Sequence, residues 1–225
     1  MRWTPFLLLL SLFFVPGQGM LAQEDLTIRV IPRFGLLNPD SYFYEEFANF
    51  ADDEATEWTT GSLGRAAYVG MALELGLEEQ GIFLRGEVGR SFEGWLSAVR
   101  GIVRPRVFFE PPEIISTWLD VPAAMTFATT QLVLPTRFEY WGIRPYFFFG
   151  GGGKWYHFGE PTEPNTVEAI LPSDGFTANL DLGTGLTFGL WGLDFDVQAR
   201  DALSRYWGKN QNDLIFSGGL IWRLR

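Results

Sequence analysis

The sequence predicts an all-β protein, an eight-stranded antiparallel transmembrane β-barrel in meander order, preceded by a cleavable signal peptide. Three observations support this fold class. The chain begins with an apolar leader, most of the rest alternates apolar and polar side chains with a period of two, and long connections alternate with short ones. The expected domains are a signal peptide over residues 1–22 and an outer-membrane β-barrel domain over residues 23–225.

The leader holds the only long apolar run of the chain, from Phe6 to Val15. This run is too short to cross a bilayer as a helix, which needs about 20 residues. Arg2 precedes the run and small residues follow it, which is typical of a secretory signal peptide. We expect cleavage after Ala22, with cleavage after Gly19 as the alternative. A buried N-terminal helix is the competing interpretation, but nothing amphipathic continues the run.

The composition excludes several classes of function. A chain of 225 residues suffices for one domain, and it contains no cysteine, so disulfides do not stabilise the exported protein. The 27 acidic residues outnumber the 17 basic ones, which argues against a nucleic-acid partner because such binding needs a basic surface. No phosphate loop, dinucleotide fingerprint or metal-spaced His/Cys set is present, so we expect no cofactor and no metal.

The alternation is clearest between Phe176 and Leu190, where apolar residues occupy one face and small or polar residues the other. This pattern predicts a strand with an apolar outside and a polar inside. Seven further segments show it, each as long as the roughly 9–11 residues of a tilted transmembrane strand. The expected strands cover approximately residues 26–37, 62–77, 82–96, 117–129, 142–156, 176–189, 193–203 and 213–224.

The connections between these strands give an independent test of the fold. Barrels of the outer membrane have short periplasmic turns and longer external loops. The expected connections, in chain order, cover residues 38–61, 78–81, 97–116, 130–141, 157–175, 190–192 and 204–212. Long and short connections alternate as they must in a barrel with an even number of strands and both termini in the periplasm.

Tryptophan positions support the same fold. Outside the leader, the tryptophans lie at or just beyond the ends of the expected strands, where the membrane–water interface satisfies both an apolar ring and its N–H group. The core of a soluble β-sandwich is the competing interpretation, but it does not explain why the strand centres lack tryptophan. The expected interfacial residues are Trp58, Trp95, Trp118, Trp141, Trp155, Trp191, Trp207 and Trp222.

Two segments carry a family resemblance. The segment Arg144 to Gly153 (RPYFFFGGGG) and the final strand Leu214 to Leu224 resemble those of the small outer-membrane barrels of the OmpA/OmpW-like superfamily. The resemblance implies a location in the cell outer membrane and contact with outer-membrane lipid and lipopolysaccharide. The final strand resembles the signal that the barrel-assembly machinery binds, although it ends in Arg225 where an aromatic residue is usual.

Alternation also assigns charged side chains to the barrel interior, seven basic and six acidic. An unpaired charge there costs several kcal/mol, so we expect a structural charge network, with an ion or solute path as the alternative. Arg85 and Glu87 have Glu74 and Asp120 as expected neighbours. The predicted network consists of Arg29, Arg33, Glu74, Arg85, Glu87, Asp120, Arg144, Lys154, Asp181, Asp194, Asp196, Arg200 and Arg223.

The first long connection contains the acidic residues Asp52, Asp53, Glu54 and Glu57. They supply the oxygen ligands that a divalent cation needs, but they lack the spacing of a calcium loop, so we expect a solvated face. The aromatic residues nearby suggest a short amphipathic helix or a surface-binding patch.

His157, the single histidine, raises the possibility of catalysis. Some eight-stranded barrels hydrolyse lipid A with a His/Ser pair and a carboxylate, but their serine lies two residues after the histidine, where this chain has Gly159. We therefore expect no catalytic residues, and interpret His157 as an interfacial aromatic residue. The glycine run Gly150–Gly153 is interpreted as a close strand approach or a bend in the wall.

The sequence thus predicts a non-enzymatic outer-membrane barrel that acts as an envelope scaffold, a surface binder or a very narrow, porin-like pore. The first alternative is an OmpW-like conduit for small hydrophobic compounds, with Ile31, Tyr68, Tyr146 and Phe148 as candidates for an apolar constriction. The second alternative is a lipid A-modifying enzyme.

Overall fold

The computed structural model describes residues 26–39, 44–49, 56–77, 82–92, 94–104, 113–161, 167, 171–206 and 208–224. The leader and its cleavage site lie outside this part of the chain. Every named element within it is a β-strand, and none of its residues belongs to a helix long and apolar enough to cross a membrane.

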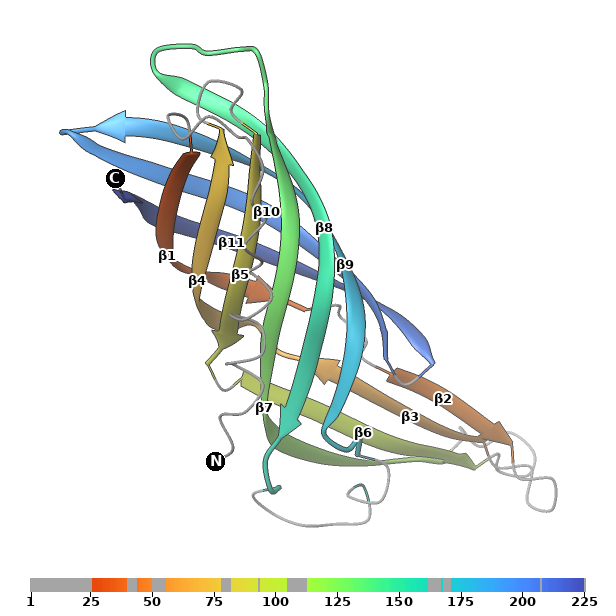
Figure 1. The fold of residues 1–225 in the computed structure, drawn as a ribbon. Coiled ribbons are helices and arrows are strands. Elements are labelled where there is room, and N and C mark those ends of the chain that lie inside the picture. Colours follow the sequence, from red (N-terminus) through yellow and green to blue (C-terminus); the bar gives the residue numbers. More distant parts are fainter. Residues whose placement is uncertain are drawn as a thin grey trace.

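Eight strands form a closed antiparallel ring (Figure 1). Each strand pairs with the next around the ring, and β1 closes it by pairing with β11, from Ile28 opposite Leu224 to Asn38 opposite Leu214. The predicted eight-stranded antiparallel barrel is therefore confirmed. The ring strands are β1 (Leu26–Asn38), β4 (Ala66–Leu77), β5 (Ile82–Ser91), β7 (Glu113–Pro135), β8 (Ile143–Phe158), β9 (Gly175–Leu190), β10 (Leu193–Tyr206) and β11 (Lys209–Leu224). We call the end of the ring that holds Leu26 and Leu224 the terminal mouth, and the opposite end the distal mouth.

Beyond the distal mouth the sheet continues on one side only. The strands β2 (Tyr44–Asn49), β3 (Thr56–Leu63) and β6 (Gly94–Arg104) pair in the order β2-β3-β6 and then with residues 113–123 of β7. Figure 1 shows this four-stranded extension at the lower right, away from the C terminus. The first and third connections were predicted as loops, which is wrong for much of their length. Residues 44–49 also form a strand and not the suggested helix.

The extension arises because the ring strands simply run on. Tyr68 pairs with Ser91 in the ring, and Leu63 pairs with Leu96 in the extension in the same register. Beyond the ring, the strands of the extension do not place apolar residues at every outward position, as a membrane strand does. The alternation that predicted the ring strands therefore stops at the junction. The predicted strands 62–77 and 82–96 therefore joined residues of the ring to residues of the extension.

Two further boundaries differ from the prediction. The ring portion of β7 runs to Pro135, so the fourth strand was predicted several residues too early and its following connection too long. The seventh connection is not a loop, because β10 and β11 stay paired as far as Tyr206 opposite Lys209. The residues of β10 and β11 nearest their connection are mostly polar. Apolar alternation therefore did not predict that the two strands stay paired there.

Two tight turns lie at the terminal mouth, and the one between β9 and β10 continues the register of its hairpin. Trp191 and Gly192 connect β9 to β10 with φ angles of 53° and 80°, and Trp141 and Gly142 have φ angles of 53° and 75° between β7 and β8. Positive φ at both central positions is the geometry of a type I′ turn, whose twist matches that of paired strands. The predicted turn at residues 190–192 is confirmed.

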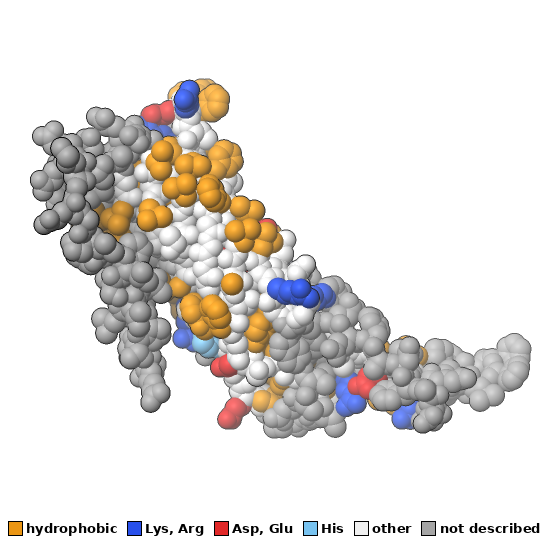
Figure 2. Space-filling model, turned by 45° about the vertical axis from the view of Figure 1, so that its right-hand side comes forward, with side chains coloured by type: hydrophobic (Ala, Val, Ile, Leu, Met, Phe, Trp, Pro, Cys, Tyr) orange, Lys and Arg blue, Asp and Glu red, His pale blue; other side chains and the backbone are white. Residues whose placement is uncertain are grey.

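The two faces of the ring differ as the alternation predicts. Along β9, Leu180, Leu182 and Leu186 are exposed, whereas Asn179 and Asp181 are buried. Figure 2 shows apolar side chains spread over the outer surface of the ring, with charged side chains towards its ends. An exposed apolar surface of this kind suits contact with lipid.

The glycine run marks a close approach of β8 to β7. A Cβ atom on Gly150 would lie 2.0 Å from the Thr130 carbonyl oxygen, and one on Gly152 would lie 2.0 Å from the Ala128 carbonyl oxygen. No side chain fits at these positions, so of the two interpretations the structure supports close strand approach.

The described tryptophans fall into three groups, and Trp207 lies outside the described residues. Trp141, Trp191 and Trp222 lie at the terminal mouth and are largely exposed. Trp58 and Trp118 lie within strands of the extension, so placing them at strand ends was wrong, whereas Trp95 is the second residue of β6. Trp155 lies on β8 near the distal mouth and packs on Phe176 at a centroid distance of 4.9 Å.

Candidate functional site

The interior of the ring is the candidate site, because it holds the largest concentration of buried charge. At its centre the Arg33 side chain, fully buried, lies between two carboxylates from other strands. Arg33 Nη1 donates to Asp196 Oδ1 at 2.6 Å, and Arg33 Nε lies 3.3 Å from Glu87 Oε2. The pleat of β1 places Arg33 inward, opposite the exposed Phe34.

Arg85 forms the next part of the network, towards the terminal mouth. Its Nη2 donates to Glu74 Oε1 at 2.5 Å, and its Nη1 donates to the Gln198 side-chain oxygen at 2.7 Å. The guanidinium also lies 5.2 Å from the centroid of Tyr146 and 5.4 Å from that of Phe148. Aromatic faces and carboxylates together replace the water that Arg85 loses on burial.

Arg200 and Lys154 continue the network towards the distal mouth. Arg200 Nη1 lies 3.1 Å from Glu87 Oε1 and 3.6 Å from Asp181 Oδ2. The Lys154 ammonium donates to Asp213, and both side chains are buried. Asp181 accepts side-chain hydrogen bonds from Asn179 on its own strand β9 and from Gln131 on β7.

Basic and acidic groups are balanced across this interior. Among the described residues, five basic side chains pair with five acidic ones, and the side chains other than Arg29 are at most 3% exposed. Such pairing offsets the several kcal/mol that each buried ion would cost alone. The ten residues are Arg29, Arg33, Arg85, Lys154, Arg200, Glu74, Glu87, Asp181, Asp196 and Asp213.

The two mouths are built differently. The terminal mouth opens into a cup of about 360 Å³ whose inner end is formed by Arg85 and Tyr146. Exposed ion pairs stand at its rim, Arg144 with Glu139 at 2.9 Å and Arg223 with Asp194 at 2.9 Å. The distal end is filled by a buried apolar cluster drawn from the ring, the extension and the β8–β9 connection. Its members include Leu37, Leu96, Leu119, Val121, Met125, Phe127, Tyr156, Val167, Tyr206 and Ile215.

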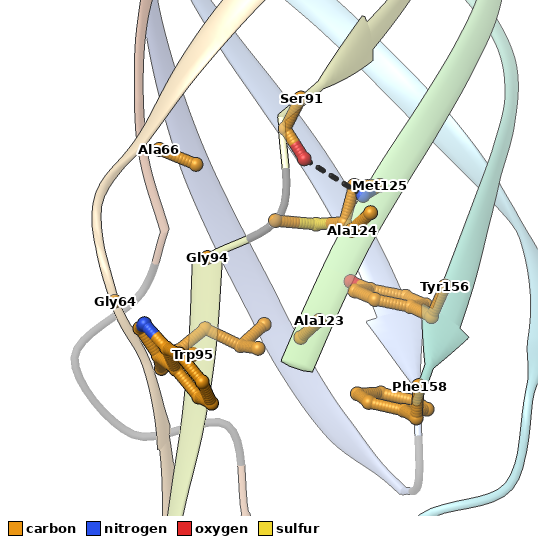
Figure 3. Close-up of a pocket in the computed structure, with 11 residues that line it drawn as sticks. Gly64, Ala66, Ser91, Gly94, Trp95, Ala123, Ala124, Met125, Tyr156 and Phe158 are labelled. Carbon is orange, nitrogen blue, oxygen red and sulfur yellow. Dashed lines mark hydrogen bonds between the residues drawn. The ribbon is translucent and has the colours of Figure 1, made fainter. Parts of the chain in front are cut away.

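The junction of ring and extension leaves only a cavity of about 10 Å³, shown in Figure 3. The Ser91 hydroxyl accepts the Met125 N–H at 2.8 Å where the backbone ladder changes register. Gly64, Trp95, Ala123 and Tyr156 surround the space. A cavity of this size holds about one water molecule, so the wall is closed at this point.

The structure brings most of the predicted network together but corrects four of its positions: Asp120, Arg144, Arg223 and also Asp194, which pairs with Arg223 at the rim of the cup. Asp120 lies on the exposed face of the extension and accepts from Ser97 Oγ at 2.6 Å, so it is not a neighbour of Arg85. It was misplaced because residues 113–122 continue β7 beyond the ring. Arg144 and Arg223 are exposed at the rim of the cup rather than buried in the interior.

Sequence reasoning missed Asp213, Gln131 and Gln198, which are buried within the network. Asp213 was the first residue of an expected strand, and the exposed Leu214 and Phe216 were a sufficient signal that it points inward. The glutamines carry no charge, so a search for charged residues passed over them.

The aromatic residues suggested as an apolar constriction belong to the polar network. The Tyr68 hydroxyl donates to Glu87 at 2.8 Å, and the Tyr146 hydroxyl donates to Asp196 at 2.7 Å. Ile31 packs apart from them, against Ala72 and Ile221. These residues do not line a continuous apolar path.

His157 lies on the outer surface near the distal mouth. Its Nε2 is 3.3 Å from Thr126 Oγ1, and its Nδ1 is 3.8 Å from Asp174 Oδ2, beyond hydrogen-bond distance. A hydrolytic triad needs a hydrogen bond between base and carboxylate and a pair of oxyanion donors. The backbone N–H groups beside Thr126 and His157 belong to the paired ladder of β7 and β8.

The first acidic connection is described only in part. Asp52, Asp53 and Glu54 lie outside the described residues, and Glu57 accepts a hydrogen bond from Arg100 Nε across the extension. Within the described residues no group of three or more His, Cys, Asp or Glu side chains is arranged to hold a metal ion.

The fold is shared with a solved structure of Neisserial surface protein A. The two chains are 10% identical, with a TM-score of 0.51, and the match covers 89% of this chain and 100% of that one. The chain has the fold of the small outer-membrane β-barrels. No protein-family model and no curated protein sequence matches it.

Two other small barrels were found with lower scores. Ail, the attachment invasion locus protein of Yersinia pestis, is 12% identical, with a TM-score of 0.39 over 88% of this chain and 98% of that one. The N-terminal barrel domain of Pseudomonas aeruginosa OprF is 13% identical, with a TM-score of 0.38 over 87% and 97%.

Proposed function

We propose that this protein is a non-catalytic outer-membrane barrel with a closed interior, which serves as a scaffold that displays the extension at the cell surface. In this arrangement the terminal mouth and both termini face the periplasm, and the distal mouth faces outward. The short turns at the terminal mouth and the long extension at the distal mouth support this orientation, as in other barrels of this fold.

The observation that carries the proposal is the filled interior. An eight-stranded barrel is just wide enough for side chains to fill, and here paired arginines and carboxylates occupy the centre while apolar side chains occupy the distal end. A solute passing through would have to separate Arg33 from Glu87 and Asp196 and also displace the apolar cluster. These contacts favour a scaffold or surface binder over a pore, and over a conduit for hydrophobic compounds.

Conductance in planar lipid bilayers tests the proposal. We expect the inserted wild-type protein to show no steady ion conductance, and a channel to appear, if at all, only after network residues are removed. A stable, large conductance of the wild-type protein, unchanged in Arg85→Ala, would refute the closed interior. Recovery of a soluble protein whose gel mobility does not change on boiling would refute the membrane barrel itself.

A further inference from the structure

Three polar side chains lie side by side on the outer surface of the ring near its distal end. Arg90 on β5 is the ladder partner of Thr126 on β7, and Thr126 Oγ1 lies 3.3 Å from His157 Nε2 on β8. Their chain neighbours Phe127 and Tyr156 are buried inside the barrel, so these three side chains point outward. They form a row across three adjacent strands.

The row lies where the apolar surface of the ring ends. Towards the terminal mouth the outward positions of β5 and β7 are apolar, with Leu84 opposite Leu132. Towards the extension the outward positions become mixed, with Trp95 opposite Pro122 and then Ser97 opposite Asp120. Trp155, the ladder partner of Thr126, also marks this level, since tryptophan prefers the membrane–water interface. In an inserted barrel the row would lie at the depth of the lipid headgroups.

Arg90 differs from the arginines of the interior in having no counter-ion. Its side chain is exposed, and it makes no ion pair or hydrogen bond among the residues that the structure describes. Arg33, Arg85 and Arg200 each contact carboxylates. The planar guanidinium of Arg90 therefore offers its donors to a group from outside the protein, and its geometry suits phosphate.

Thr126 offers a second donor to the same group. Asp174 lies on the β9 side of His157, and the imidazole turns its Nε2 towards Thr126. When Nε2 carries the hydrogen, the Thr126 hydroxyl accepts it and keeps its own hydrogen for an external acceptor. The order of the strands places Arg90 and the Asp174 carboxylate on opposite sides of Thr126, which leaves the Arg90 side open to an anion.

We propose that Arg90 and Thr126, with His157 as a positioning residue, bind the phosphate of a lipid headgroup at the distal surface of the membrane. The inference rests on the proposed membrane placement, and it adds a specific lipid contact to it. The apolar surface below the row receives the acyl chains, and the guanidinium and hydroxyl bind the phosphate.

Titration of the full chain in micelles of an uncharged detergent tests this inference. A short-chain phosphatidic acid is added, and tryptophan fluorescence reports binding because Trp155 adjoins Thr126. We expect saturable binding that Arg90→Gln weakens about tenfold or more, since a hydrogen bond to a charged group is worth roughly that factor. Thr126→Val should weaken binding less, and Arg90→Lys should retain part of it.

Arg144→Gln is the matched control, because Arg144 is an exposed arginine at the opposite mouth and its loss should leave the affinity unchanged. A neutral diacylglycerol of the same chain length tests the need for phosphate, and inorganic phosphate alone tests the need for lipid. Equal binding of the neutral lipid, equal affinity of Arg90→Gln, or equally tight binding of free phosphate would each overturn the inference. A gel mobility that changes on heating verifies that each variant is folded. If the wild-type protein did not show this change, the proposed membrane barrel would be refuted, and not the lipid contact alone.

Discussion

The ring and the extension are continuous sheets with opposite polarity. In the ring, Arg33 and Glu87 point inward and leucines point outward, which reverses the arrangement in a soluble protein. In the extension, Leu96 and Leu119 are buried on the inner face, and Ser97 and Asp120 are on the outer face. The same strands therefore pass from a segment with charged residues inside and leucines outside into one with leucines inside and a mixed outer face, which also exposes Trp95 and Trp118.

The change of polarity coincides with the irregularity at the junction. Along β7, inward and outward positions alternate on either side of residues 123–125, but Ala123, Ala124 and Met125 are all buried. Ser91 supplies a side-chain acceptor for the Met125 N–H at this point. The comparison teaches that an irregularity in the strand pairing at the distal end of the ring separates two different packing patterns.

The largest effect is expected in the ring interior. Arg85→Ala should destabilise the barrel by roughly 3–5 kcal/mol, because it leaves the buried Glu74 and Asp196 carboxylates with less compensation. Denaturant unfolding of the protein in detergent micelles measures the change. Arg85→Met combined with Glu74→Leu should recover part of the stability, since apolar groups then replace a pair of charges.

The matched control is Arg144→Ala, which breaks an ion pair that is 62% and 51% exposed. Exposed pairs contribute about 0–1 kcal/mol, so this variant should unfold almost like the wild-type protein. If Arg85→Ala and Arg144→Ala lowered the free energy of unfolding equally, the interior ion pairs would be as solvated as the exposed pair. The proposed difference between interior and surface would then be wrong.

A second pair of variants tests the boundary between ring and extension. Leu182→Arg should cost about 2–4 kcal/mol, because Leu182 lies on the lipid-facing surface near the middle of β9. Trp118→Arg changes an equally outward residue of the extension, which is 66% exposed, and it should cost far less in lipid vesicles. If the two substitutions cost the same, the outer face of the extension also contacts lipid and the boundary has been misplaced.

The sequence alone predicted the ring well because every ring strand follows the same pattern of outward apolar residues. Each strand that crosses the apolar layer must turn apolar residues outward, so segments such as Phe176–Leu190 carry a strong signal. The same rule placed Arg33, Arg85, Asp196 and Arg200 inside the ring, where the structure joins them.

Prediction failed where the rule stops applying. The extension packs as a soluble sheet, so its strands looked like long loops, and Asp120 was assigned to an interior that ends before it. The pairing partners inside the ring could not be predicted either. Gln198 meets Arg85 from a strand 113 residues away, and that contact depends on closure of the barrel and not on any local pattern.

The smallest effect is expected at the single histidine. His157→Phe replaces a half-buried ring on the outer surface by another aromatic ring, and it removes only a long contact to Thr126 and a distant carboxylate. Surface substitutions of this kind change the free energy of unfolding by about 0.5 kcal/mol or less. Because no described carboxylate lies within hydrogen-bond distance of the imidazole, neither the wild-type protein nor the variant is expected to release fatty acid from lipid esters. Mass spectrometry of lipids incubated with both proteins provides the measurement. Fatty-acid release by the wild-type protein that disappears in His157→Phe would restore the enzymatic interpretation.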